Sequence, residues 1–499
     1  MFQIKDFKPR EYQANILKTC ENKNTLVVLP TGLGKTKVAI SLAIQRLNKF
    51  PNSKAIILTP TKPLSAQIQS EFIESTNIPK EKIILLTGQI KPEIRKQLFQ
   101  DSAVIVATPQ TIQFDLQNNR ISLEDTSLLV LDECHRSREN FANTKVAQFY
   151  LQQSTNQRIL ALTASPGSTL KKINEIKQNL NLTATEIRTD QDEDIKKHVQ
   201  QKESQQIYVT IPEEIKQIKT LLQTIYKQKL KNLRSIGLTK PINIINKTDL
   251  LKFQGFLQYE LKKGNKSSFY GLSLNAQAIK LEHAMTLLET QGVKPFNLYI
   301  EKLKKDPSKA AKIILNENKI QKAIQITRHL EENNFVHPKQ QKLKELLEEE
   351  LKKNPDSKII IFANYRFTVD ELTSFLKKIP NAKPAKLVGQ KEGLTQKEQT
   401  QTIQDYEDNI HNILITTSIG EEGIHLGSAD LAIFYEPIPS EIRSIQRKGR
   451  VARIKIGKII YLITKGTKDE AFFWASHNKE KKMKKILYGM QEKEKQSKL

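Results

Sequence analysis

The stretch TLVVLPTGLGKTKVAI, residues 25 to 40, decides the fold of the first part of this chain. An apolar run, TLVVL, passes into a turn with two glycines, and the turn passes into a segment with helical spacing of its apolar residues. A strand, a glycine turn and a helix in this order form the setting of a phosphate-binding loop, because backbone N–H groups at the helix start surround phosphate oxygens. The sequence therefore predicts a nucleotide site in an α/β domain.

The loop itself carries the groups that phosphate binding needs. Gly32 and Gly34 let the backbone approach phosphate, Lys35 adds a positive charge, and Thr36 offers a hydroxyl to Mg²⁺. The general pattern has glycine where this chain has Leu29, so this match alone leaves chance agreement open. The residues expected to contact the nucleotide are Thr31, Gly32, Leu33, Gly34, Lys35 and Thr36.

A second motif, LLVLDECH at residues 128 to 135, ends another apolar run with two carboxylates. Beside a phosphate loop, Asp132 can hold Mg²⁺ and Glu133 can orient or deprotonate the attacking water. The alternative for the pair is an acidic cap between strand and loop. His135 either couples the nucleotide site to a second site or is an ordinary loop histidine. We expect Cys134 to be a packing residue, since no basic residue is assigned to activate it.

Short apolar runs bounded by turn residues recur between residues 25 and 162 and again between 358 and 463, which is typical of buried parallel strands. Between them, long amphipathic segments such as PEEIKQIKTLLQTIYKQKLKNL replace the strand pattern. The prediction is an α/β protein with two parallel-sheet lobes and an inserted helical domain. Its expected parts are residues 1–205 (first lobe), 206–335 (helical insertion), 336–475 (second lobe) and 476–499 (basic C-terminal tail, or one amphipathic helix).

Composition limits the class of protein and the kind of partner. The 499 residues carry 80 Lys and Arg against 54 Asp and Glu, a net charge of +26, so a polyanion such as nucleic acid is the expected partner. A merely solubilising lysine surface would give the same balance. Two cysteines form no disulfide framework, and no apolar run suits a membrane or a signal peptide. We expect a cytoplasmic, nucleoid-associated protein.

Taken together, PTGLGKT, DECH, TAS (Thr163 to Ser165) and QRKGRVAR (Gln446 to Arg453) resemble the ordered motif set of superfamily 2 helicases. The resemblance implies two RecA-like lobes that close on ATP and Mg²⁺, with Gln446 near the γ-phosphate and His135, Thr163 and Ser165 coupling hydrolysis to nucleic acid. Arg450 and Arg453, three residues apart on one helix face, match its arginine fingers. REYQ resembles its adenine-reading motif, with Gln13 pairing with the base and Tyr12 or Phe7 stacking on it.

The same resemblance implies a path for one nucleic-acid strand across both lobes. TPTKPL, TG and ATPQT in the first lobe, with FANYR and TTSIGEEGIHL in the second, end expected strands with small or hydroxyl-bearing residues that suit phosphate contacts. Gly423 is expected at the nucleotide, and Thr417, Gly420 and Glu422 are the candidates for gripping the strand and coupling it to ATP. His425 stands where many relatives carry aspartate, which puts that nucleotide contact in doubt. The expected strand contacts are Thr61, Lys62, Thr87, Gly88, Thr108, Arg366 and Thr417.

FYEPIPSEIRSIQRKGR, residues 434 to 450, together with the helical insertion resembles the archaeal Hef and Fanconi-anaemia M branch. That branch implies a DNA helicase or translocase moving 3′-to-5′ on forks, flaps and Holliday junctions in repair or replication restart. No acidic nuclease cluster follows QRKGRVAR, so we expect any cleavage to come from a separate partner protein. The alternatives are an RNA-directed motor of the RIG-I type and a non-hydrolysing DNA-binding scaffold.

The insertion is also expected to bind nucleic acid, as a thumb that holds branched duplex through phosphates. The alternative is a solvated lysine face. The cations that favour the thumb are Lys216, Lys219, Lys227, Lys229, Lys231, Arg234, Lys252, Lys262, Lys263 and Lys266.

Overall fold

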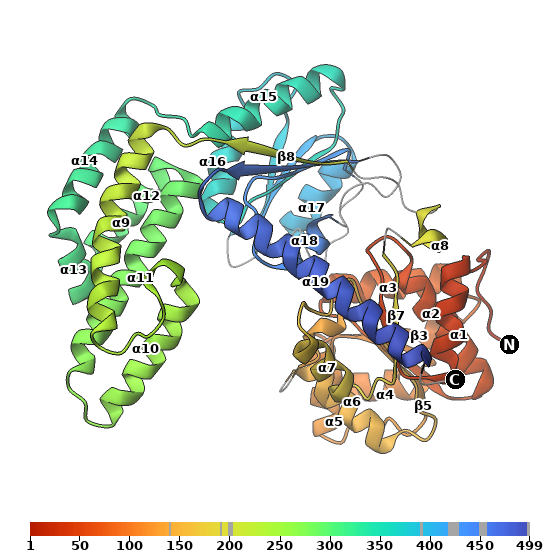
Figure 1. The fold of residues 1–499 in the computed structure, drawn as a ribbon. Helices are drawn as coiled ribbons and strands as arrows, with labels where there is room; N and C mark the ends of the chain where they lie inside the picture. The colour runs from red at the N-terminus through yellow and green to blue at the C-terminus, as the bar shows by residue number, and fades with distance from the viewer. Residues whose placement is uncertain are drawn as a thin grey trace.

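The computed structural model describes residues 1–138, 141–189, 192–197, 203–389, 393–417, 429–448 and 457–496. Within these ranges the chain forms two parallel β-sheets, and a helical bundle stands to one side of them (Figure 1). The prediction of two α/β lobes with an inserted helical domain is confirmed.

The first sheet has seven parallel strands in the order β3-β4-β2-β5-β6-β1-β7. Alternate residues of β1 to β6 enter two different cores. In β1, Leu26 and Val28 face one layer of helices, while Val27 and the following Leu29 face the other. Burial on both faces explains why these strands are continuous apolar runs. The strands are β1 (Thr25–Val28), β2 (Lys54–Leu58), β3 (Ile83–Leu86), β4 (Val104–Ala107), β5 (Thr126–Leu131), β6 (Ile159–Thr163) and β7 (Ala184–Ile187).

Helices cover both faces of this sheet. One layer holds α1 (Glu11–Asn22), α2 (Lys35–Lys49), α3 (Lys62–Ser75) and α8 (Glu193–Lys196), and the other holds α4 (Pro92–Asp101), α5 (Pro109–Gln117), α6 (Ala142–Gln153) and α7 (Leu170–Asn179). Proline at the first or second position of α3, α4 and α5 starts these helices without losing a hydrogen bond. Each helix therefore begins just after a strand or a short turn.

The second sheet corrects one predicted boundary. Its order is β10-β11-β9-β12-β13-β8, and β8 (Glu203–Val209) pairs in parallel with β13 over seven residues. The boundary predicted between residues 205 and 206 cuts β8, because this edge strand is mostly exposed and its sequence, ESQQIYV, has no apolar run. The other strands are β9 (Ile359–Phe362), β10 (Pro384–Leu387), β11 (Ile413–Thr416), β12 (Leu431–Phe434) and β13 (Lys458–Thr464).

The helices of the second lobe are α15 (Pro338–Lys353), α16 (Arg366–Leu376), α17 (Gln396–Glu407), α18 (Glu441–Lys448) and α19 (Lys468–Gln496). The last of these corrects a second boundary, because the segment expected to be a separate tail from residue 476 continues a helix that starts at Lys468. In Figure 1 α19 runs from the second lobe back across the first lobe. Met483 and Leu487 enter the first lobe's core.

The insertion consists of α9 (Glu213–Arg234), α10 (Lys247–Lys262), α11 (Ser268–Gln291), α12 (Val293–Lys304), α13 (Lys309–Leu315) and α14 (Asn318–Glu332). It has two cores: one joins α9 and the end of α11 to α12, α13 and α14, and a distal one joins the end of α9 to α10 and the start of α11. Buried polar contacts anchor α11 to the second lobe, including Gln291 with Glu436 and Thr368. Among the described residues, no helix is long and apolar enough to cross a membrane.

Candidate functional site

The candidate nucleotide site lies where three neighbouring strands, β5, β6 and β1, reach the same edge of the first sheet. The phosphate loop follows β1, DECH follows β5, and TAS ends β6. Carboxyl ends of parallel strands are the usual binding edge of such sheets. The structure therefore brings together three motifs that lie far apart in the chain.

Both loop glycines have backbone conformations that other residues avoid. Gly32 has φ 87° and Gly34 has φ 72°, and Gly34 caps the start of α2. A Cβ atom on Gly34 would lie 2.6 Å from Nε2 of Gln13. Position 34 thus requires glycine for its conformation and also for the close approach of α1.

Two residues of REYQ, Tyr12 and Gln13, hydrogen-bond to the backbone of the phosphate loop. The hydroxyl of Tyr12 donates a hydrogen bond of 2.9 Å to the carbonyl of Leu33, and Gln13 Nε2 donates one of 3.4 Å to the same oxygen. Tyr12 has no exposed surface. The stacking of Tyr12 or Phe7 on adenine stays a prediction. Phe7 is half-buried beneath Lys37, whose Nζ lies 5.9 Å from its ring centroid.

The burial of Leu29 and its backbone contact with Lys35 explain how the loop has leucine where the general pattern has glycine. Leu29 is fully buried in the sheet's core, and its carbonyl accepts a 3.1 Å hydrogen bond from Lys35 Nζ. The Leu29 side chain packs in the core that includes α1 and α2, whereas its backbone oxygen holds the lysine beside the loop. Leucine at this position is therefore compatible with phosphate binding.

The two DECH carboxylates carry signs of a strained, highly charged site. Glu133 has φ 51°, a left-handed conformation that is uncommon outside glycine and clusters at functional sites. Burial and the neighbouring Glu133 charge raise the pKa of Asp132 to about 7, and Lys35 opposes this shift. Negative charge that the protein alone leaves poorly compensated fits a site for a divalent cation. Cys134 is fully buried and its pKa is raised well above the usual value, as expected of a packing thiol.

A hydrogen-bonded cluster joins DECH to TAS. Nδ1 of His135 lies 3.2 Å from Glu133 Oε2 and 3.4 Å from Thr163 Oγ1, and the Ser165 amide donates to Thr163 Oγ1 over 3.1 Å. Ser165 Oγ in turn donates to the sulfur of Met483 on α19 over 3.1 Å. Met483 was not predicted as a site residue, because nothing marks a methionine in a lysine-rich segment as a neighbour of TAS.

The second lobe contributes α18, which carries the start of QRKGRVAR. Gln446 is 3% exposed, and its neighbour Arg447 is fully buried against the rings of Phe362 and Phe434. Arg447 donates to the Glu436 carbonyl and to Asn364 Oδ1, so it fixes α18 to the sheet. No role was predicted for Arg447 from the sequence. The expected residues Arg450, Arg453, Gly423, Gly420, Glu422 and His425 lie outside the described residues.

The predicted strand contacts of the first lobe gather at the ends of β2, β4 and β3, which are neighbours in the sheet. Thr61 and Thr108 precede α3 and α5 directly, and the Thr61 hydroxyl is buried without a hydrogen-bond partner among the described residues. Gly88 lines a cavity of about 570 Å³ with Arg95 and Phe114. Lys62 and Thr87 line another, of about 500 Å³, which α17 of the second lobe closes from the other side.

The second-lobe strand contacts end β9 and β11, which are also neighbours. Arg366 starts α16, is half-exposed, and lies 3.5 Å from Asp370. Thr417 is buried, and its amide donates to the Leu387 carbonyl over 3.4 Å. The described residues thus place the expected contacts on the carboxyl edges of both sheets.

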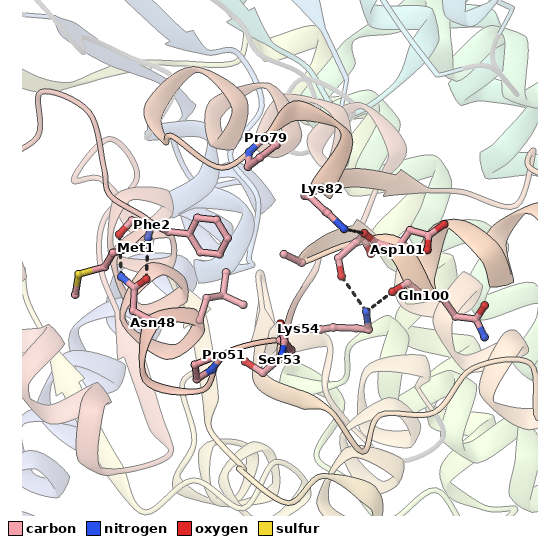
Figure 2. A pocket seen from close by; sticks show the side chains of 14 residues that line it. Met1, Phe2, Asn48, Pro51, Ser53, Lys54, Pro79, Lys82, Gln100 and Asp101 are labelled. Carbon is pink, nitrogen blue, oxygen red and sulfur yellow. Dashed lines mark hydrogen bonds between the residues drawn. The ribbon is translucent and has the colours of Figure 1, made fainter.

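A separate cavity of about 690 Å³ lies at the opposite, amino-terminal edge of the first sheet (Figure 2). Lys54 donates to the carbonyls of Gln100 and Ser102, and Lys82 donates to that of Asp101. These amines are used to hold the end of α4. None of the residues predicted to act on nucleotide or nucleic acid lines this cavity.

Comparison with known proteins gives the family. Residues 10–173 match the DEAD/DEAH box helicase family, residues 339–455 the helicase conserved C-terminal domain, and residues 214–334 the helical bundle of putative ATP-dependent RNA helicases. The crystal structure of the Pyrococcus furiosus Hef helicase domain is similar, with a TM-score of 0.74 and 41% sequence identity, over 94% of this chain and 98% of that one. The chain belongs to the Hef-like branch of superfamily 2 helicases. This membership confirms the expected use of ATP.

Other Hef-like relatives are longer than this chain. A putative ATP-dependent RNA helicase of Methanocaldococcus jannaschii is 37% identical over 98% of this chain and 62% of the relative. The ATP-dependent DNA helicase fml1 of Schizosaccharomyces pombe is 33% identical over 93% of this chain and 57% of its own length. The chain therefore spans only part of the length of these two relatives.

Proposed function

We propose that this Hef-like helicase is an ATP-driven motor that moves 3′-to-5′ along DNA and acts on forked or branched DNA in repair or replication restart. The observation that carries the proposal is the contact of Glu133 with His135 and Thr163 beside the phosphate loop. It joins the carboxylate suited to activating water to the segment that leads toward α19 and the second lobe. A motor needs such a link, because ATP hydrolysis has to change the position of one lobe relative to the other.

In the first lobe each residue has a role that its geometry permits. Lys35 exchanges the Leu29 carbonyl for a phosphate oxygen of ATP, while Gly32 and Gly34 present backbone N–H groups. Glu133 orients the attacking water. Asp132 and the Thr36 hydroxyl would hold Mg²⁺, which supplies charge neutralisation on the phosphates.

We propose that the second lobe supplies the remaining groups of the ATP site. Gln446 approaches the γ-phosphate, and Arg450 and Arg453 stabilise charge on the transferred phosphoryl group. Such an arginine is worth roughly 10³ to 10⁵ in rate. Because neither lobe holds all of these groups, hydrolysis requires closure, and a strand gripped by Thr61, Thr108 and Arg366 would favour it.

DNA is favoured over RNA as the nucleic acid along which the motor moves, although some of the similar proteins are named for DNA and others for RNA. The relatives from Neurospora crassa and Schizosaccharomyces pombe are named DNA helicases, whereas the M. jannaschii relative and the helical-bundle family are named for RNA. The Hef helicase domain combines the highest identity among these with nearly complete coverage. The support for DNA comes from the relatives that are named DNA helicases. A nucleoid location and a separate nuclease partner follow only from this proposal.

The test compares ATP hydrolysis stimulated by single-stranded DNA, a fork, a four-way junction and duplex RNA, each at several stated salt concentrations. Strongest stimulation by fork or junction supports the proposal. Strongest stimulation by duplex RNA favours the RIG-I-type alternative, and binding without any stimulated hydrolysis favours a scaffold.

A further inference from the structure

Four exposed aromatic residues lie near one hairpin at the far end of the helical insertion. Phe256, Tyr259, Phe269 and Tyr270 are 47%, 56%, 64% and 60% exposed, and all lie at the hairpin where α10 ends and α11 begins. We call these four residues the aromatic tip. Single exposed apolar residues need no explanation, but a group of them marks an interaction surface.

The aromatic tip is not part of an incomplete core. Leu250, Phe253 and Leu257 turn one face of α10 into the distal core, which the ends of α9 and α11 complete. Lys252, Phe256, Tyr259 and Lys263 follow one another at helical spacing along another face. The hairpin is closely packed, since a Cβ atom on Gly271 would lie 2.9 Å from Leu257. The rings are therefore carried on a well-packed support.

Ring contacts restrain two of the four aromatic residues. Phe256 stacks on the buried Phe253 with ring centroids 5.7 Å apart, and Lys263 Nζ lies 4.4 Å from the Tyr259 ring centroid. These contacts reduce the freedom that the side chains would lose on binding a partner. Rigid exposed rings favour recognition by stacking.

Some cations of the insertion form ion pairs and others do not. Several lysines there are paired, as in Lys219 with Glu289 and Lys229 with Glu317, so these two cations of the predicted thumb have structural partners. In the part of the chain that the structure describes, no ion pair involves the exposed lysines near the tip, which are Lys252, Lys262, Lys263 and Lys266. Lys227, Lys231 and Arg234, near the end of α9, are likewise exposed and in none of the described ion pairs, so the cations left for a polyanion lie toward the hairpin end of the insertion.

Gly255 supplies an independent observation on the same helix. It lies within α10, is exposed, has no positive φ, and has nothing within 4 Å of where a Cβ atom would be. A glycine inside a helix is destabilising by about 0.5–1 kcal/mol relative to alanine, and the described packing gives no reason for it. Its open position between Lys252 and Tyr259 leaves room for a partner to approach the helix closely.

We propose that the aromatic tip stacks on unpaired nucleobases at the branch point of DNA, while the neighbouring lysines hold the backbone phosphates. This inference rests on the proposed function. Unpaired bases expose the π faces that such rings bind, whereas intact duplex hides them. The tip therefore distinguishes a branch from plain duplex, which phosphate contacts alone do not.

The test uses the full chain with Phe256→Ala and Tyr259→Ala combined, and a fork that carries 2-aminopurine at its unpaired junction base. Loss of stacking should weaken fork binding by about tenfold or more, with blunt-duplex affinity nearly unchanged. The fluorescence of 2-aminopurine, which stacking on the rings lowers, should return toward that of the fork without protein. Phe256→Trp retains a stacking ring and should keep tight binding. Leu298→Ala, at an exposed apolar residue of α12 outside the tip, is the matched control. Melting curves check the fold of each variant.

Equal fork affinity and equal fluorescence in the double variant would overturn the proposal. A similar loss for fork and blunt duplex would also overturn it, because the surface would then be a phosphate site. Unchanged DNA binding with loss of a protein partner would make the tip a protein-docking surface instead. Fork-stimulated ATP hydrolysis of the unaltered chain tests the proposed function separately, so the two failures are distinguishable.

Discussion

At the residue scale, the nucleotide site depends on backbone positions with left-handed conformations, in the loop and in DECH. Gly34 is the more constrained of the loop glycines, because Gln13 lies against its α-carbon. Glu133 holds its left-handed conformation without being glycine. The motif predicts the loop glycines, whereas the sequence gives no sign of the conformation at Glu133.

Gly34→Ala should destabilise the nucleotide-free protein more than Gly32→Ala does. Left-handed backbone costs about 1–2 kcal/mol in each alanine variant. Only the substitution at position 34 in addition displaces Gln13, since the space around Gly32 is open. Thermal unfolding without nucleotide measures the difference, and equal losses would show that Gln13 does not restrict position 34.

At the element scale, the buried strands and the loop that follows β1 are predictable, but the elements that join the lobes are not. β8 is a mostly exposed edge strand, so its pairing with β13 leaves no apolar pattern in the sequence. In α19 the two buried contacts, Met483 and Leu487, stand in a segment rich in lysine. Burial there depends on a partner lobe, and a single segment does not reveal its partner.

Leu487→Ala should destabilise the protein because it empties part of the first lobe's core. Leucine-to-alanine changes in cores cost about 2–5 kcal/mol, whereas Lys485→Ala, at an exposed position of the same helix, should cost under about 0.5 kcal/mol. Denaturant unfolding compares the two variants. Similar small losses in both would contradict the packing of α19 on the first lobe.

The start of α15 predicts a pH dependence. His337 caps this helix, since its Nδ1 accepts from the Lys339 amide, and burial with the Lys339 charge lowers its pKa to about 3. In the unfolded chain this imidazole binds a proton below about pH 6.5, whereas in the folded chain it stays neutral at that pH. The free energy of unfolding therefore falls as the pH drops below about 6.5. Between pH 7 and pH 5.5 this group should cost about 1 kcal/mol.

Unfolding at both pH values, for the parent and for His337→Asn, isolates this contribution. The difference is needed because burial raises the pKa of Glu436 to about 7, which has the opposite effect on stability over this range. An equal pH dependence in parent and variant would contradict a buried neutral imidazole.

In the whole molecule, the two lobes are linked in two observed ways. The insertion is anchored to the second lobe, and α19, which starts in the second lobe, packs on the first. The proposed ATP site between the lobes would be a third link. Ser165 and Lys448 both contact α19, at Met483 and Glu480. A single helix thus touches TAS of the first lobe and, in the second, the helix that begins the arginine-bearing motif. This arrangement is suited to a motor whose lobes move in a coordinated way.

The proposed motor has one ATP site, which both lobes complete and DNA controls. The rate of fork-stimulated ATP hydrolysis in the parent, Lys35→Ala and Arg450→Ala tests it most directly. Each substitution alone should lower the stimulated rate by about 10³-fold or more, since each lobe supplies an indispensable group. A stimulated rate that stays near the parent's in either variant would contradict the account.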